Sequence, residues 1–175
     1  MTPIIVTGCG FCGTNAVVKM LMDMGYYMGE YWLKPNKKMH PYPVYEDAEF
    51  YHAQEMLNQG FNWYLKDLLQ RRITHFNNKW GFKAPNNFKY LDVYHHELTT
   101  SFKLIACVRD KPTLVSRMHE RWYYSHREAH DRIESYLEVV KKYKKLVPTL
   151  VINQNLLRKD NDGWRERIQS FIGTS

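Results

Sequence analysis

The chain has 175 residues, of which 44% are hydrophobic and 15% aromatic, and this composition excludes an intrinsically disordered protein. The 25 Lys and Arg outnumber the 18 Asp and Glu, which gives a net charge of +7 and favours an anionic ligand. The sequence has no zinc-finger spacing and no aromatic RNA-binding motif, so we expect no nucleic-acid partner. No apolar run approaches the roughly 18 residues that span a bilayer, and we therefore expect a soluble, cytoplasmic protein.

The N-terminal half predicts one strand, a glycine-containing loop and three helices. A β-branched strand over Pro3–Thr7 precedes the loop. The predicted helices are Thr14–Met24, which ends before Gly25, and two further patterns over 46–59 and 62–76. Residues 26–45 are rich in Tyr, Pro, Lys and Trp and lack periodicity, so we predict a long irregular segment of the kind that often carries function.

The C-terminal half alternates short apolar strands with helical patterns. The predicted strands are 79–85, Phe102–Asp110 and Thr149–Asn153, the last two read as buried parallel strands. The predicted helices are 86–98 with an asparagine at its N-cap, Pro112–Ser125, 131–146 and 162–173. This alternation predicts one domain over residues 1–175 with a three-layer α/β/α fold and a central parallel sheet.

The loop GCGFCGTN, Gly8 to Asn15, joins the first strand to the first helix. Glycines let successive backbone N–H groups turn inward, and a helix N-terminus adds partial positive charge, so this arrangement can bind phosphate. The dinucleotide motif G-x-G-x-x-G fits, but no acidic residue ends a second strand about 20 residues later. The triphosphate motif G-x-x-x-x-G-K-[ST] also fits, except that Thr14 follows Gly13 with no lysine. A purely structural turn remains the third interpretation.

The loop also contains a C-x-x-C pair, Cys9 and Cys12, and a third cysteine is Cys107. A redox motif needs a thioredoxin-like context, and a zinc site needs further ligands in register. The sequence supplies neither, so we interpret these cysteines as small loop-filling residues and expect no metal.

Several segments, taken in order, resemble the sulfotransferases that use 3′-phosphoadenosine 5′-phosphosulfate. The loop Gly8–Asn15 resembles their 5′-phosphosulfate loop, and WGFKAPN over Trp80–Asn86 looks like their Gly-x-Lys-x-Pro strand end. Phe102–Arg117 is similar to their 3′-phosphate-binding strand and helix. Further resemblances lie in Asp23–Glu30, Tyr45–Leu57, 149–157 and 163–173. The resemblance implies a P-loop-like fold and transfer of a sulfuryl group to the hydroxyl or amine of a small-molecule or carbohydrate acceptor.

The resemblance also implies roles for individual residues. The 5′-phosphosulfate end would contact Gly10, Phe11, Cys12, Gly13, Thr14 and Asn15. Arg109 and Ser116 would hold the 3′-phosphate, with Arg117 as a substitute because Ser116 follows Arg109 by one residue fewer than is usual. Lys83 would be the cation that stabilises charge during transfer. The RKDNDGW run, 158–164, echoes a further 3′-phosphate segment, but it comes too soon after its strand, and we interpret it as a loop.

Two departures leave alternatives open. Phe11 stands where the family usually has Lys or Arg, which favours a non-catalytic binder of adenosine 3′,5′-bisphosphate as a second hypothesis. A P-loop nucleotide kinase is a third, disfavoured by the missing lysine. The general base is not determined by the sequence. Its candidates are Glu46, Asp47, His40 and His52.

Overall fold

A computed structural model of the chain describes residues 2–29, 45–76, 79–84, 86–98 and 102–173. Its centre is a parallel four-stranded sheet in the order β2-β1-β3-β4. The strands are β1 (Ile4–Thr7), β2 (Gly81–Phe82), β3 (Lys103–Val108) and β4 (Thr149–Asn153). Ile5 of β1 lies opposite Phe82 on one side and Leu104 on the other. The carboxyl ends of β2 and β3 therefore flank the point where the glycine loop leaves β1.

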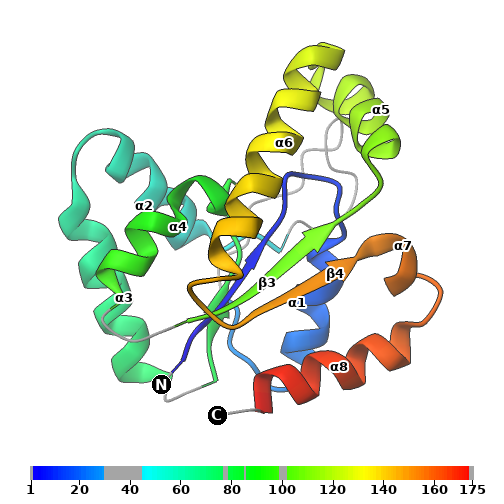
Figure 1. The fold of residues 1–175 in the computed structure, drawn as a ribbon. Helices are drawn as coiled ribbons and strands as arrows, with labels where there is room; N and C mark the ends of the chain where they lie inside the picture. Colours follow the sequence, from blue (N-terminus) through cyan, green and yellow to red (C-terminus); the bar gives the residue numbers. More distant parts are fainter. Residues whose placement is uncertain (1, 30–44, 77–78, 85, 99–101, 174–175) are drawn as a thin grey trace.

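Helices cover both faces of this sheet. They are α1 (Thr14–Asp23), α2 (Ala48–Asn58), α3 (Asn62–His75), α4 (Asn87–Glu97), α5 (Lys111–Trp122), α6 (His126–Tyr143), α7 (Gln154–Leu157) and α8 (Asn161–Gly173). Helices α1 and α8 lie on one face, and α4 and α6 lie on the other (Figure 1). Side chains alternate along β1, so Ile5 belongs to one buried cluster while Ile4 and Val6 belong to the other. No described helix is long and apolar enough to cross a membrane.

The predicted three-layer α/β/α arrangement is confirmed, and some of its elements differ from those predicted. Strand β4 is an edge strand and is largely half-buried, with Ile152 its buried residue. The prediction of a buried strand is wrong because, among the described residues, β3 alone pairs with it. Helix α6 begins at His126, not at residue 131, because Ser125 and Glu128 form a reciprocal capping box.

The start of α4 also differs from the prediction. Asn86 stands at the N-cap position in a left-handed conformation (φ 57°), and its side chain makes no capping hydrogen bond. Its Oδ1 instead accepts a hydrogen bond from Arg132 of α6. The next residue, Asn87, donates from Nδ2 to the Val6 carbonyl at 3.1 Å. The two asparagines thus connect α4 to α6 and to the end of β1, directly beneath the glycine loop.

Candidate functional site

The glycine loop has a backbone that favours glycine at two positions. Gly10 (φ 106°), Phe11 (φ 52°) and Gly13 (φ 84°) all have left-handed conformations. A Cβ atom on Gly10 would lie 2.2 Å from Cη2 of Trp122, and one on Gly13 would lie 2.8 Å from Cγ of Gln154. Helix α1 starts immediately afterwards with no side-chain cap at Gly13. The loop therefore offers backbone donors and a helix N-terminus, the combination that binds anions.

Arg132 and Trp122 hold the loop from the α5–α6 hairpin. Arg132 Nε donates to the Cys9 carbonyl at 3.0 Å. Its guanidinium lies 5.5 Å from the Trp122 ring and 5.2 Å from the Phe88 ring. The Trp122 ring in turn packs on Phe11 with a centroid distance of 4.7 Å. Phe11, which replaces the expected cation, is thus part of an aromatic wall, and a positively charged side chain reaches the loop from α6.

Lys83 and Asn15, which the sequence places in the site, lie together with the candidate base Glu46. Lys83 follows β2, and its Nζ donates to Asn15 Oδ1 at 2.8 Å and to Glu46 Oε1 at 3.2 Å. The Lys83 side chain is only 8% exposed and that of Glu46 is 20% exposed. Burial lowers the pKa of Lys83, and the Glu46 carboxylate opposes this effect. A buried ammonium group is therefore fixed at the first turn of α1.

Asp47, the neighbouring candidate base, has structural contacts instead. Its Oδ1 accepts hydrogen bonds from the backbone N–H groups of Glu49 at 3.0 Å and Phe50 at 3.4 Å, which makes it the N-cap of α2. Its Oδ2 accepts from Arg72 at 2.9 Å. Its own backbone N–H donates to the Lys83 carbonyl at 2.6 Å. Both carboxylate oxygens are engaged, so Asp47 anchors the segment that carries Glu46.

The pH dependence of stability tests the environment of Asp47. Burial raises the pKa of Asp47 to about 6, even though Arg72 acts in the opposite direction. The folded state therefore binds this proton more tightly than the unfolded state, and the carboxyl contributes more stability as the pH falls from about 6 to about 4. The Asn of Asp47→Asn does not titrate, so only wild type loses this contribution as the pH rises. Between pH 4 and pH 7 we expect the free energy of unfolding of Asp47→Asn to rise by about 2–3 kcal/mol relative to that of wild type. Urea titrations at both pH values measure it; a constant difference would contradict the prediction.

The two histidine candidates are not brought into the site. His52 lies on α2 with its side chain 52% exposed, and its Nδ1 is 3.8 Å from Glu55 Oε2. His40 lies outside the described residues. Of the predicted candidates with a described side chain, Glu46 alone contacts Lys83.

Arg109 forms a cationic centre on the other side of the loop. It follows β3, its side chain is 13% exposed, and its Nη1 donates to the Phe11 carbonyl at 3.4 Å. Burial lowers the pKa of Arg109, and the positive charges of Arg158 and Arg117 lower it further, against the effect of Asp110. Arg109 Nε lies 4.0 Å from Asp110 Oδ1, and the two further arginines leave an excess of positive charge that favours an anion. Arg158, which the sequence predicts to lie in a loop, is the C-cap residue of α7, and its positive charge lowers the pKa of Arg109.

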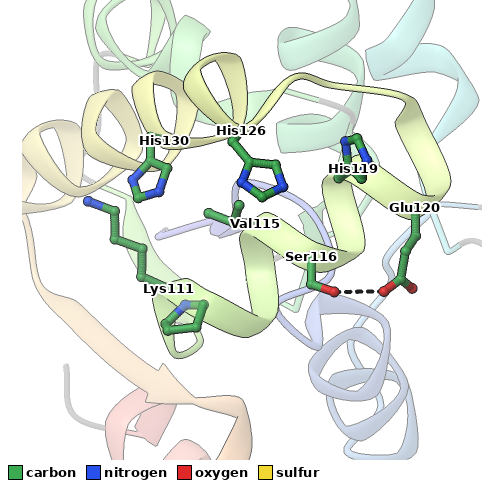
Figure 2. Close-up of a pocket in the computed structure, with 8 residues that line it drawn as sticks. Lys111, Val115, Ser116, His119, Glu120, His126 and His130 are labelled. Atoms are coloured by element: carbon green, nitrogen blue, oxygen red, sulfur yellow. Dashed lines mark hydrogen bonds between the residues drawn. The ribbon is translucent and has the colours of Figure 1, made fainter.

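Ser116 forms its side-chain hydrogen bond within α5. Its Oγ donates to Glu120 Oε1 at 2.6 Å, and Figure 2 shows these two side chains pointing toward one another on α5. Both line a pocket of about 460 Å³ between α5 and α6, together with Lys111, Pro112, Val115, His119, His126 and His130. Arg117 Nη1 lies 3.6 Å from Glu120 Oε2, and the charge of Arg117 also lowers the pKa of Arg109. Within the described residues, no three His, Cys, Asp or Glu side chains are arranged to hold a metal ion.

Comparisons with known proteins identify the class of fold. No protein-family model matches the sequence, and no curated protein sequence matches it. Among solved structures, the YorR protein of Bacillus subtilis in complex with phosphorylated GDP matches with a TM-score of 0.60 and 13% identity, over 98% of this chain and 95% of that one. The sulfotransferase domain of the Synechococcus PCC 7002 olefin synthase matches with a TM-score of 0.61 and 13% identity, over 98% and 72%.

A third solved structure extends the likeness to kinases. Deoxyadenosine kinase from M. mycoides, with bound dATP, matches with a TM-score of 0.55 and 12% identity, over 96% of this chain and 100% of that one. At sequence identities this low, the similarity to these structures supports a shared fold and nothing further. The chain therefore has a P-loop-like three-layer α/β/α fold, which a sulfotransferase domain and a kinase both share with it.

Proposed function

We propose that the protein binds 3′-phosphoadenosine 5′-phosphosulfate and transfers its sulfuryl group to the hydroxyl or amine of a small-molecule or carbohydrate acceptor. The observation that carries the proposal is a pair of cationic centres on either side of one glycine loop. Lys83 approaches the loop from the end of β2, and Arg109 approaches it from the end of β3. A donor with two separated anionic groups, one at each end of its ribose, matches these two centres and the loop between them.

The residues on the two sides of the loop have different roles in the proposed reaction. In-line transfer breaks the bond between sulfur and the bridging phosphate oxygen and forms a bond from sulfur to the acceptor oxygen or nitrogen. Negative charge develops on the bridging oxygen, where a preorganised ammonium group such as Lys83 lowers the barrier. The acceptor proton goes to Glu46, the carboxylate that lies 3.2 Å from Lys83 Nζ. Arg109, with Arg117 and Arg158, holds the 3′-phosphate.

A non-catalytic binder of adenosine 3′,5′-bisphosphate is the second candidate, and Phe11 favours it. The Phe11 ring packs on Trp122 at the position where sulfotransferases usually carry a cation, so one direct stabiliser of the leaving phosphate is missing. A nucleotide kinase is the third candidate, since a kinase shares the fold.

Calorimetry against three ligands separates these candidates. We expect adenosine 3′,5′-bisphosphate and its phosphosulfate to bind, and ATP with Mg²⁺ to bind weakly or not at all. Tight binding of ATP without preference for a 3′-phosphate would overturn both the sulfotransferase and the binder proposals. Binding of the bisphosphate without sulfuryl transfer to any member of a broad panel of alcohols and amines would favour the binder.

Arg109→Ala tests the 3′-phosphate site. A charged hydrogen bond contributes about 1.5–3 kcal/mol, so we expect the preference for adenosine 3′,5′-bisphosphate over adenosine 5′-monophosphate to fall roughly tenfold or more. Arg127→Ala is the control, because that arginine is 92% exposed and pairs with Asp131 on α6. An unchanged preference in Arg109→Ala would remove Arg109 from the site.

A further inference from the structure

The cysteines of the glycine loop lie in contact with each other. Cys9 Sγ and Cys12 Sγ are 3.3 Å apart, and both thiols are free and buried. The Cys12 thiol also lies 3.0 Å from the Gly10 carbonyl, to which it donates. A disulfide needs the two sulfur atoms to approach to about 2.05 Å, a movement that the short Gly10–Phe11 connection between them permits without crossing any other element. This proximity was not predicted, because the sequence lacks a thioredoxin-like context.

The two thiols differ in their electrostatic surroundings. The contact with the Cys12 sulfur lowers the pKa of Cys9, and the charge of Arg132 lowers it further, while burial acts in the opposite direction. The same contact and burial raise the pKa of Cys12. Arg132 is held over the pair by its hydrogen bond to the Cys9 carbonyl. A neighbouring cation favours the thiolate, which is the nucleophilic form of cysteine, and the Cys12 sulfur lies 3.3 Å away as the thiol that would resolve an oxidised Cys9.

We propose that Cys9 and Cys12 are a redox modification site, which a small hydroperoxide converts into a reversible disulfide within the phosphate loop. The Cys9 thiolate attacks the peroxide, which gives a Cys9 sulfenic acid and releases hydroxide or an alkoxide. Cys12 then attacks the Cys9 sulfur, the S–S bond forms, and the sulfenic oxygen leaves as water with the Cys12 proton. The two thiols are oxidised and the peroxide is reduced; a dithiol reverses the step. Both thiols are buried, which excludes bulky oxidants.

The disulfide acts on the part of the loop that would hold phosphate. Once oxidised, Cys12 has no proton to donate, and the hydrogen bond that fixes the Gly10 carbonyl is lost. Gly10 and Phe11 lie between the two sulfur atoms and pack on Trp122. The oxidised loop is therefore displaced against Trp122 and binds phosphate less well. This last consequence rests on the proposed function, whereas formation of the disulfide does not.

Mass spectrometry of the full chain tests disulfide formation. The protein is treated with hydrogen peroxide, unfolded, alkylated and cleaved with trypsin. Residues 1–19 then form one peptide with both loop cysteines, and residues 104–109 form another with Cys107. We expect peptide 1–19 to lose two hydrogen atoms and resist alkylation until a dithiol is added, while Cys107 is alkylated throughout. Free thiols in peptide 1–19, stable oxygen adducts, or a link to Cys107 would each overturn the proposal.

Two further measurements follow the loop itself. The fluorescence of Trp122 is obtained by subtracting the signal of a Trp122→Phe protein. It is expected to change on oxidation in wild type and in Cys107→Ser but not in Cys12→Ser. No change in wild type would overturn the proposed displacement of the loop. Affinity for adenosine 3′,5′-bisphosphate is expected to fall at least threefold on oxidation in wild type and in Cys107→Ser, but not in Cys12→Ser. If the reduced protein does not bind the bisphosphate, the proposed function fails, and the peptide and fluorescence results still decide this inference.

Discussion

Replacing Lys83 by Met is expected to slow sulfuryl transfer by about 10²–10³-fold, the usual cost of removing one preorganised stabiliser of transition-state charge. The expectation follows from the position of Lys83, whose buried ammonium contacts Asn15 in the first turn of α1 and the carboxylate of Glu46. In the proposed reaction, the negative charge on the bridging oxygen is greatest during transfer. The substitution should therefore lower kcat far more than it lowers the affinity for adenosine 3′,5′-bisphosphate. Single-turnover assays and calorimetry measure the two quantities separately.

Lys79→Met is the matched control. Lys79 precedes β2 and is exposed, so its replacement removes the same charge at the opposite end of the same strand and should leave kcat unchanged. Thermal unfolding of Lys83→Met establishes that the variant folds, and the Met side chain fills the volume of the lysine stem. A folded Lys83→Met protein with a wild-type kcat would exclude Lys83 as a catalytic residue.

The sequence predicted the parts of the site that depend on local pattern. A β-branched strand followed by closely spaced glycines indicated the loop after β1, and the apolar run through Cys107 indicated β3 with Arg109 at its end. These predictions succeeded because the apolar run of β3 and the conformations of the loop glycines depend on neighbouring residues. The resemblance assigned both Lys83 and Asn15 to the site, and the structure brings the two side chains into contact.

The contacts that the sequence did not predict join residues that lie far apart along the chain. Arg132 reaches the Cys9 carbonyl from 123 positions away, and no spacing rule connects an arginine inside an amphipathic helix to a glycine loop. Arg158 was not predicted to contact the 3′-phosphate because its segment comes too soon after the preceding strand, although its position at the C-cap of α7 brings its charge near Arg109. Asp47 was read as a candidate base from its residue type, whereas its burial and its ion pair with Arg72 depend on how α2 and α3 pack.

Arg72→Met is expected to lower the free energy of unfolding by about 3–5 kcal/mol, because it leaves a buried carboxylate without its partner. Arg72 donates to Asp47 Oδ2 at 2.9 Å and to Glu49 Oε2 at 2.5 Å, with its side chain 3% exposed. Its guanidinium also lies 4.7 Å from the centroid of the Tyr27 ring. Chemical denaturation at pH 7 measures the change, and Met preserves most of the aliphatic packing so that lost charge dominates the result.

Arg71→Ala and a double variant separate charge from packing. Arg71 adjoins Arg72 on α3 but is 45% exposed, and surface ion pairs contribute under about 1 kcal/mol, so its replacement should have little effect. Asp47→Asn combined with Arg72→Met removes the uncompensated charge while its amide oxygen still caps α2, and it should recover at least about 1 kcal/mol. Equal losses in the single and double variants would mean that packing, and not the buried carboxylate, sets the cost. The backbone of Asp47 fixes the segment that carries Glu46, so Arg72 stabilises the same contact with Lys83 on which the proposed transfer depends.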